Sequence, residues 1–408
     1  MINDTFCKRV ENELILRGFS KAGEIALCCK SQDPFPIDSN FGIIQEVKDA
    51  LNNGIKHKHC TCCWQQERKG IYSWRQVGNE MLMEFKNVEL YLDNTCDLAC
   101  VYCSPKYSSR WSQEIKIQKE NGRDIQKYVN ADYYDEKKEN YNHLPRMLKY
   151  VELLGKQAKN SKPLYLNLLG GEPLLTSAIK KDVICDIIDA FFSQTTNDQY
   201  LGINIVSNCN TPEHVINKTI KLLKQNFQKY KNLRINLTAS VESTGEVAEF
   251  IRYGLDWNIF EKNLKKWFLL ENTNVSFSMA VNIISWKFTP DFFVYVFKKA
   301  EEYNKFVNIN FNTVMFPKHL SIQMLPDKFL KTYDNIESIL YKNKHLIVHD
   351  KVFKKIVTQI EQSKHDFGIL SKDKKYKSLA LGYFDYMRNY RNKDIRKINP
   401  ELFDFLSI

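Results

Sequence analysis

Apolar and polar residues follow two different periods through the middle of the chain. Short apolar runs typical of β-strands alternate with longer stretches whose apolar residues recur every three or four positions, as in amphipathic helices. Six runs are strand candidates: MEFKNVELYL, PLYLNLLGG, LGINIVSN, LRINLTASV, NVSFSMAVNII and VNINFNTVMF. Strands that alternate with helices pair in parallel through crossover helices, so the pattern predicts an α/β fold with a curved sheet or a partial barrel.

The same pattern divides the chain into three parts. Residues 83–320 contain the strand candidates and are expected to form a partial (β/α)6 barrel, with ligand chemistry at the carboxyl ends of the strands. Residues 1–82 are rich in cysteine and include one helix-like stretch, GIIQEVKDALNNG, which ends at a helix-stopping Asn-Gly. The polar segment 110–162 and the extension 321–408 are both predicted to be mainly helical.

Composition narrows the class of protein. A hydrophobic fraction of 43% and a charged fraction of 26% are those of a folded, soluble chain. We expect a cytosolic protein without a membrane segment, because no apolar run is long enough to span a bilayer and MINDTFCKRVENE lacks the pattern of a signal peptide. The net charge of +11 would suit nucleic acid or an acidic leader peptide, although lysine-rich helices are more often simply solvated.

The cysteines are clustered and too sparse for a disulfide scaffold. Of the 11 cysteines in the chain, three lie in the stretch YLDNTCDLACVYCSPKY, directly after the first strand candidate. Thiolates from Cys96, Cys100 and Cys103 in one loop suit a cubane iron-sulfur cluster whose fourth iron stays open to another ligand. The alternative is a zinc site completed by a distant fourth ligand.

The motif CDLACVYC resembles the CxxxCxφC motif of the radical S-adenosylmethionine (SAM) enzymes, in which φ is aromatic and is here Tyr102. The resemblance implies that SAM chelates the fourth iron of a [4Fe-4S] cluster. Reductive cleavage of SAM would then give a 5′-deoxyadenosyl radical that abstracts hydrogen from a substrate. It also implies a flavodoxin- or ferredoxin-like electron donor.

The second strand candidate ends in LLGGEPLLT. Gly170 and Gly171 let the backbone approach a ligand closely, Glu172 adds a carboxylate, and Pro173 cannot continue sheet pairing. These four residues resemble the motif that binds the amino group of SAM in the same family.

Later strand ends carry polar residues where the family contacts the rest of SAM. Arg252 in EFIRYG is similar to an arginine that pairs with the SAM carboxylate, and a guanidinium suits that task because it can bind in bidentate fashion. Glu242 stands where many relatives have Asp. Each of these residues could instead be a strand-end cap or face solvent. The resemblance implies further SAM contacts from Ser207, Asn208, Ser240, Glu242 and Asn282.

The N-terminal cysteines suggest a second metal site. Cys7, Cys28, Cys60 and Cys63 provide four soft ligands for an iron-sulfur cluster or zinc, and we favour a second [4Fe-4S] cluster. The spacing C-x15-G-x4-C resembles the start of SPASM and twitch auxiliary-cluster modules, although the better-known arrangement has them at the C-terminus. Other candidate ligands are Cys29, Cys62, His57 and His59.

Three hypotheses for function follow. The first is a radical SAM enzyme that modifies a peptide or protein side chain, since auxiliary modules in relatives often accompany peptide substrates. The second keeps the radical chemistry but acts on a nucleotide, a nucleic acid or a small sugar. The third is a non-catalytic binding protein stabilised by metal, with four-ligand closure at each site and no SAM binding.

Overall fold

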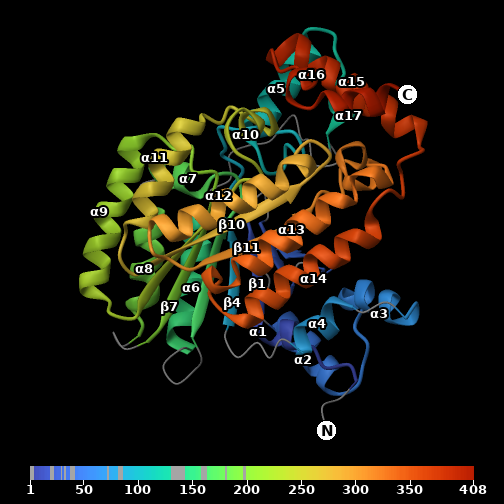
Figure 1. The fold of residues 1–408 in the computed structure, drawn as a ribbon. Helices are drawn as coiled ribbons and strands as arrows, with labels where there is room; N and C mark the ends of the chain where they lie inside the picture. Colours follow the sequence, from blue (N-terminus) through green and yellow to red (C-terminus); the bar gives the residue numbers. More distant parts are fainter. Residues whose placement is uncertain are drawn as a thin grey trace. The chain divides into compact units, whose positions relative to one another are not determined.

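The computed structural model describes residues 4–18, 23–28, 30–31, 34–36, 42–70, 73–80, 86–129, 143–157, 163–179, 182–195 and 199–408 (Figure 1). Cys29 therefore lies outside the described residues. Contacts group the chain into two compact units, and each is described by itself. The first unit comprises Met1–Asn94, Lys137–Ile205 and Lys218–Ile235, and the second comprises Thr95–Glu136, Val206–Asn217 and Asn236–Ile408.

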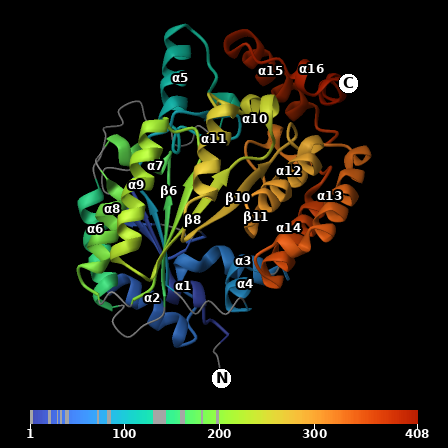
Figure 2. The ribbon, with the colours of Figure 1, turned by 60° about the vertical axis from the view of Figure 1, so that its left-hand side comes forward.

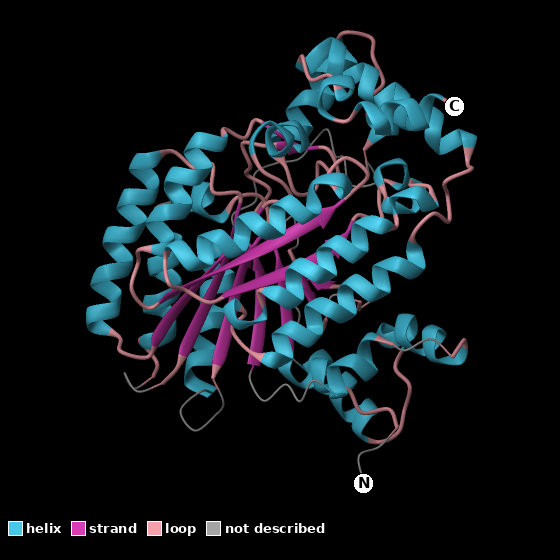
Figure 3. Cartoon of the chain, in the orientation of Figure 1, coloured by secondary structure: helices cyan, strands magenta, loops and turns pink. Residues whose placement is uncertain are grey.

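The strands are the magenta arrows in Figure 3. The described strands are β1 (Glu13–Arg17), β2 (Glu24–Ala26), β3 (Phe35–Pro36), β4 (Lys86–Tyr91), β5 (Ala99–Cys100), β6 (Leu164–Leu169), β7 (Leu201–Ser207), β8 (Leu233–Ser240), β9 (Arg252–Tyr253), β10 (Thr273–Val281) and β11 (Val307–Thr313).

The main sheet has the strand order β11-β10-β8-β7-β6-β4-β1-β2-β3, and β5 pairs separately with β9. All six predicted strands are confirmed as β4, β6, β7, β8, β10 and β11, and they follow one another in chain order. Pairing is parallel between β4 and β6, between β6 and β7, and between β10 and β11. The predicted α/β class with a parallel sheet is therefore correct.

The N-terminal residues extend this sheet, which the sequence pattern did not indicate. Strand β1 pairs in parallel with β4, and β2 and β3 follow it in antiparallel pairing. The division of the chain at residues 82 and 320 remains a prediction, because the two units group residues by packing and not by chain order.

The helices are amphipathic, and those of the C-terminal extension confirm its predicted helical character. The described α-helices are α1 (Lys8–Asn12), α2 (Gly42–Asn52), α3 (Thr61–Arg68), α4 (Trp74–Glu80), α5 (Ser109–Glu120), α6 (Leu144–Gln157), α7 (Pro173–Ile179), α8 (Val183–Phe192), α9 (Glu213–Lys229), α10 (Gly245–Ile251), α11 (Trp257–Phe268), α12 (Thr289–Glu302), α13 (Lys331–Lys342), α14 (Asp350–Asp366), α15 (Lys374–Arg391), α16 (Ile395–Ile398) and α17 (Pro400–Ser407). Short 3-10 turns include η1 (Lys58–Cys60) and η2 (Gln126–Tyr128). None of the described helices has the length and apolar character needed to cross a membrane.

The first unit shows why its strands carry two different faces. Along β6, Leu164, Leu166 and Leu168 are buried, whereas Tyr165 and Asn167 between them are only half-buried. Helices α6 and α8 pack against each other beside these strands (Figure 2). The apolar face thus forms the core, and the other face presents polar side chains.

In the second unit, local sequence signals set the helix ends. The side chain of Asp256 accepts hydrogen bonds from the first turn of α11, and Asp373 does the same for α15. The residue that caps the C-terminus of α15 is Asn392, whose φ of 53° is the left-handed conformation typical of this position. Trp286 and Tyr333, both fully buried, pack together with ring centroids 4.5 Å apart.

Candidate metal and cofactor site

The loop that carries Cys96, Cys100 and Cys103 is held by its backbone in the second unit. Its short strand β5 pairs with β9, so that Cys100 lies opposite Arg252. The amide of Cys103 donates to the carbonyl of Cys100 at 3.0 Å. At the start of the loop, the hydroxyl of Ser109 accepts from the amide of Cys96 at 3.1 Å and donates to its carbonyl. These bonds fix the positions from which the cysteine side chains project.

The thiols of this loop are shielded from water. Cys100 is buried, and Cys96 and Cys103 are half-buried. Burial, together with the neighbouring Cys100, raises the pKa of Cys103 to about 12 and raises that of Cys96 as well. Burial also raises the pKa of Cys100 to about 11, although the guanidinium of Arg252 opposes this rise. Three thiolates would repel one another here unless cations were bound between them.

Two nitrogen donors point at the sulfurs of this loop. Arg252 Nη1 lies 3.8 Å from the Sγ of Cys100, and Asn208 Nδ2 lies 4.0 Å from the Sγ of Cys96. Asn208 Nδ2 also donates to Asp97 Oδ1 at 2.9 Å, and Asn210 Nδ2 donates to the other oxygen of Asp97 at 2.8 Å. Donors of this kind stabilise negative charge on sulfur, as around iron-sulfur clusters. The chemistry of the residues therefore fits a cluster ligated by three thiolates.

Arg252 and Glu242 bind each other in the structure. Nε and Nη2 of Arg252 lie 3.2 and 2.8 Å from Oε2 of Glu242, and both residues are buried. The hydroxyl of Tyr102, inside the cysteine motif, donates to the same carboxylate at 3.2 Å. Although burial opposes it, the Glu242 carboxylate raises the pKa of the Arg252 guanidinium well above its usual range. The ion pair thus keeps a cation beside Cys100, and the predicted SAM contacts of these two residues remain a prediction.

Other predicted residues stabilise turns at strand ends. Asn282 caps the turn after β10, where its Oδ1 accepts from the amides of Ile284 at 3.0 Å and Ser285 at 3.3 Å. The hydroxyl of Ser207 at the end of β7 accepts from the amide of Cys209 at 3.0 Å. Ser240, the last residue of β8, is half-buried. For Asn282 and Ser207 these bonds are those of the strand-end caps considered as the alternative to SAM contacts.

The motif Gly170–Pro173 follows β6 in the first unit. Gly170 and Gly171 have φ values of 83° and 55°, which residues with a Cβ rarely adopt. The carboxylate of Glu172, which is 1% exposed, accepts from the amide of Leu174 at 3.1 Å. Helix α7 starts at Pro173, where a missing N–H costs nothing. The motif therefore forms a tight strand-to-helix turn.

The four favoured N-terminal cysteines come together in the first unit. They line one pocket: Cys7 directly precedes α1, Cys28 lies two residues after β2, Cys60 ends the turn η1, and Cys63 lies on helix α3. Cys62 does not line this pocket. Burial and the neighbouring Cys7 raise the pKa of Cys60 to about 12. The structure thus brings together the set of thiols that the sequence spacing selected.

A partly buried ion pair also backs this pocket. Nε and Nη2 of Arg75 each lie 3.0 Å from a carboxylate oxygen of Glu67, and Nη1 donates to the carbonyl of Phe6 at 2.9 Å. The guanidinium stacks 4.9 Å from the ring of Trp64. His59 lines the pocket too, so it remains an alternative ligand, and His57 accepts a hydrogen bond from its amide at 3.4 Å.

No group of three or more His, Cys, Asp or Glu side chains within the described ranges is arranged to hold a single metal ion. A zinc ion needs four donors within about 2.3 Å of one point. The choice between an iron-sulfur cluster and zinc at the N-terminal pocket remains a prediction.

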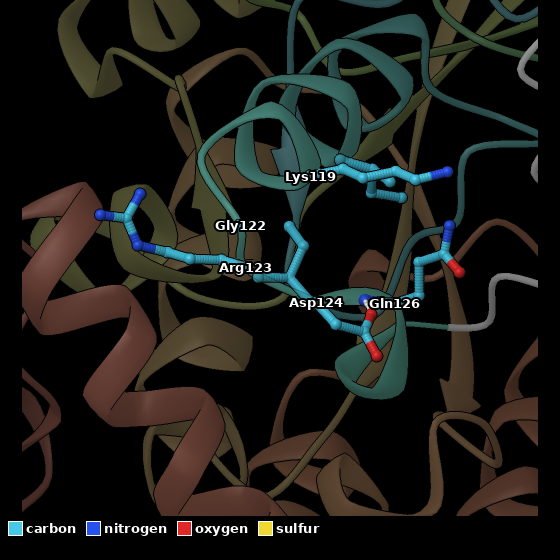
Figure 4. Close-up of a pocket in the computed structure, with 7 residues that line it drawn as sticks. Lys119, Gly122, Arg123, Asp124 and Gln126 are labelled. Atoms are coloured by element: carbon cyan, nitrogen blue, oxygen red, sulfur yellow. Dashed lines mark hydrogen bonds between the residues drawn. The ribbon is translucent and has the colours of Figure 1, made fainter.

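A larger cavity, of about 260 Å³, lies between the end of α5 and the turn η2. Its lining residues lie outside both cysteine regions of the sequence. Lys119, Asp124 and Gln126 are among the residues that line it (Figure 4). Arg123 extends away from them, and its guanidinium stacks 4.4 Å from the ring of Tyr390. The cavity is formed by one short segment of mostly exposed residues and contains none of the predicted site residues.

Comparison with known proteins identifies no family. No family model matches the chain, and no curated protein is found as a relative. Similar solved structures include native anSMEcpe with bound AdoMet, with a TM-score of 0.42 at 14% identity over 63% of this chain and 61% of that one. Native anSMEcpe with bound AdoMet and the Cp18Cys peptide has a TM-score of 0.38 at 14% identity, over 63% of this chain and 58% of that one. Similarity at this level carries no argument about function, and the chain spans less than two thirds of these proteins.

Proposed function

We propose that this protein is a radical SAM enzyme. Cys96, Cys100 and Cys103 would bind three irons of a [4Fe-4S] cluster and leave the fourth to SAM. The observation that carries the proposal is the loop itself, with three shielded thiols in the spacing CxxxCxYC and nitrogen donors directed at two of their sulfurs. When bound, the cluster and SAM supply a 5′-deoxyadenosyl radical that abstracts a hydrogen atom from the substrate.

The residues around this loop have distinct tasks in the proposal. Arg252 and Asn208 stabilise negative charge on the ligating sulfurs, and Glu242 with Tyr102 keeps the guanidinium of Arg252 in place. We assign SAM binding to the set that the motif resemblance implies. Its members are Tyr102, Gly170, Gly171, Glu172, Pro173, Ser207, Asn208, Ser240, Glu242, Arg252 and Asn282.

A second [4Fe-4S] cluster is assigned to the N-terminal pocket. Its ligands would be the four cysteines that line the pocket, Cys7, Cys28, Cys60 and Cys63. The pocket has its own small core, in which Val10, Leu27 and Trp64 pack around Cys7. Because this core is small, the metal would contribute folding energy to the segment.

The proposed substrate is a peptide or protein side chain. Supporting it in the first unit is a row of carboxamides on the polar face of the sheet. Asn204 donates to Asn167 at 3.0 Å, and Asn167 donates to Asn87 at 2.6 Å. All three are half-buried, and a carboxamide both donates and accepts hydrogen bonds, as a peptide backbone requires. A flavodoxin- or ferredoxin-like protein would supply the electron.

The decisive experiment is anaerobic reconstitution with iron and sulfide, followed by addition of SAM and dithionite. We expect about eight irons per chain and release of 5′-deoxyadenosine. Cys96→Ala should retain about four irons per chain and release no 5′-deoxyadenosine. Cys60→Ala should also retain about four irons per chain. The matched control is Cys62→Ala, which should keep all the iron because Cys62 does not line the pocket.

Each alternative has its own outcome. Four irons with one zinc would make the N-terminal site structural. A barrel site loaded with iron that never cleaves SAM would refute the enzymatic proposal in favour of a metal-stabilised binding protein. No mass change on peptides encoded near the gene would count against a peptide substrate. Nucleic-acid affinity that falls steeply with salt would favour the nucleic-acid alternative, and the absence of that slope would argue for a small molecule or peptide.

A further inference from the structure

Helix α15 ends in a buried arginine that the proposed chemistry does not use. This arginine is Arg391, and its side chain is only 1% exposed, although most arginine side chains reach solvent. It belongs to the C-terminal extension, to which the sequence pattern assigned no role. A buried guanidinium must be paired to be tolerated, so its partners reveal what the helix end is built to hold.

Those partners lie on the cysteine loop and on the helix that follows it. Nε and Nη2 of Arg391 donate to the two carboxylate oxygens of Glu114, on helix α5, at 2.8 and 2.9 Å. Nη1 donates to the carbonyl of Ala99 at 3.1 Å. Ala99 lies between Cys96 and Cys100, the first two cysteines of the motif. Helix α15 therefore binds the backbone of this loop directly, across 292 positions of sequence.

Aromatic rings complete the contact. The guanidinium of Arg391 lies 4.3 Å from the ring of Trp111 and 4.5 Å from that of Tyr253. Trp111 Nε1 donates to the carbonyl of Cys100 at 2.8 Å, and Tyr253 pairs with Ala99 between β9 and β5. The carbonyls of both Ala99 and Cys100 are thus held by donors from outside the loop.

From this geometry we propose that the C-terminal extension positions the cysteine loop, with Arg391 as the positioning residue. The loop needs such support because its regular structure is only the two residues of β5. A backbone fixed in advance lowers the entropic cost of placing three ligands around one group. The extension would therefore control how firmly the loop retains its cluster.

This proposal rests on the proposed function only as far as the cluster is concerned. The test compares full-length Arg391→Gln, Arg391→Lys and Glu114→Gln with Arg388→Gln. Arg388 lies three residues earlier on the same helix, and its side chain is 39% exposed and paired with Asp385 at 3.0 Å. It therefore controls for the loss of a positive charge from α15.

The first measurement is amide hydrogen exchange of residues 96–103, with strand β10 as an internal reference. In Arg391→Gln we expect exchange of the loop amides to rise about tenfold or more while β10 is unchanged, because a charge-assisted hydrogen bond to the loop is lost. Arg391→Lys keeps the positive charge but loses the planar guanidinium, so the exchange rate of its loop amides should lie between those of the parent and Arg391→Gln. The control should match the parent. Equal exchange in Arg391→Gln and Arg388→Gln would overturn the proposal, as would acceleration that includes β10.

The second measurement is iron loss from the reconstituted protein to a chelator, together with the electron paramagnetic resonance spectrum of the reduced protein. Arg391→Gln and Glu114→Gln should each lose about four irons at least tenfold faster than Arg388→Gln, with an altered cluster signal. Unchanged rates and spectra would refute the positioning role. A parent protein that binds no cluster would refute the proposed function instead, and hydrogen exchange would still test whether Arg391 holds the loop.

Discussion

The two cysteine regions bring their thiols together in different ways. Each collects shielded thiols beside a buried arginine that is paired with a glutamate, Arg252 with Glu242 in one and Arg75 with Glu67 in the other. In the motif loop, all three thiols come from eight consecutive residues. In the N-terminal pocket, the four thiols come from separate elements spread over residues 7–63.

The difference teaches where each site gets its shape. The loop is held by backbone pairing with β9 and by hydrogen bonds from Ser109, Trp111 and Arg391. The pocket depends on a small core around Trp64, with separate elements that the metal would tie together. The arginines also differ, since Arg252 donates to a cysteine sulfur and Arg75 to a backbone carbonyl. We therefore expect metal to stabilise the N-terminal segment more than the loop.

The largest effect should separate the two sites by activity. Cys100→Ser removes a ligand of the proposed catalytic cluster and should reduce 5′-deoxyadenosine release to background. Cys63→Ala should remove a similar amount of iron, about four atoms per chain, yet leave SAM cleavage in place. Chromatographic detection of deoxyadenosine measures both. If Cys63→Ala also abolished cleavage, the two sites would not be functionally distinct.

The next effect concerns the two ion pairs. Arg252→Gln leaves Glu242, whose side chain is 0% exposed, without its cation, so the free energy of unfolding should fall by about 3–5 kcal/mol. Arg75→Gln should cost about 1 kcal/mol, because the Glu67 side chain is 19% exposed and water can replace part of the pair. Urea unfolding measures both. The double variant Arg252→Gln with Glu242→Gln should recover part of the loss, and equal costs at the two sites would contradict this view.

In the second unit, the buried histidine His319 should make the free energy of unfolding fall at low pH. Burial lowers the pKa of His319 to about 4, and its Nε2 has no hydrogen-bond partner among the residues that the structure describes. The folded state therefore binds this proton less readily than the unfolded chain does. Stability should be full above about pH 6.5 and should fall by about 3 kcal/mol as the pH drops to 4. Measured by unfolding at each pH, His319→Phe should not show this loss of stability, whereas the exposed His345→Gln should show it as the parent does.

In the first unit, Glu13 should act in the opposite direction and more weakly. Burial raises the pKa of Glu13 to about 6, although the neighbouring Arg9 opposes the rise. The folded state therefore binds this proton more tightly than the unfolded chain. Its contribution should be full below about pH 4.5 and should be lost, by about 2 kcal/mol, as the pH rises past 6. Across this pH range, the free energy of unfolding of Glu13→Gln should change less with pH than that of the parent or of the exposed Glu120→Gln. A parallel pH profile would refute the assignment.

Features that arise from local patterns could be predicted from the sequence. The six parallel strands follow from runs such as LYLNLL, in which alternate residues are buried. The spacing of Cys96, Cys100 and Cys103 needed no tertiary information, because eight residues are short enough to form one loop. The choice of four N-terminal cysteines also agrees with the pocket that they line, while metal binding there remains a prediction.

Contacts between distant residues could not be predicted. The parallel pairing of β1 with β4 places residues 13–17 in the main sheet, although nothing in their sequence names β4 as partner. Asn210 was missed as a support for Asp97, and its place two residues after Asn208 was the only signal available. The sequence resemblance treated Glu242 and Arg252 as separate SAM contacts, and the structure shows that they bind each other.

The sequence by itself determined the period of strands and helices, the thiol spacing and the turn at Gly170–Pro173, because each depends on neighbours within a few positions. Only the tertiary structure decided which charges are buried together and which helix holds the loop. Arg391 meets Glu114 across 277 positions, and no local pattern encodes that meeting. The pairing arises because a guanidinium removed from water must find a carboxylate, and the folded backbone decides which carboxylate is within reach.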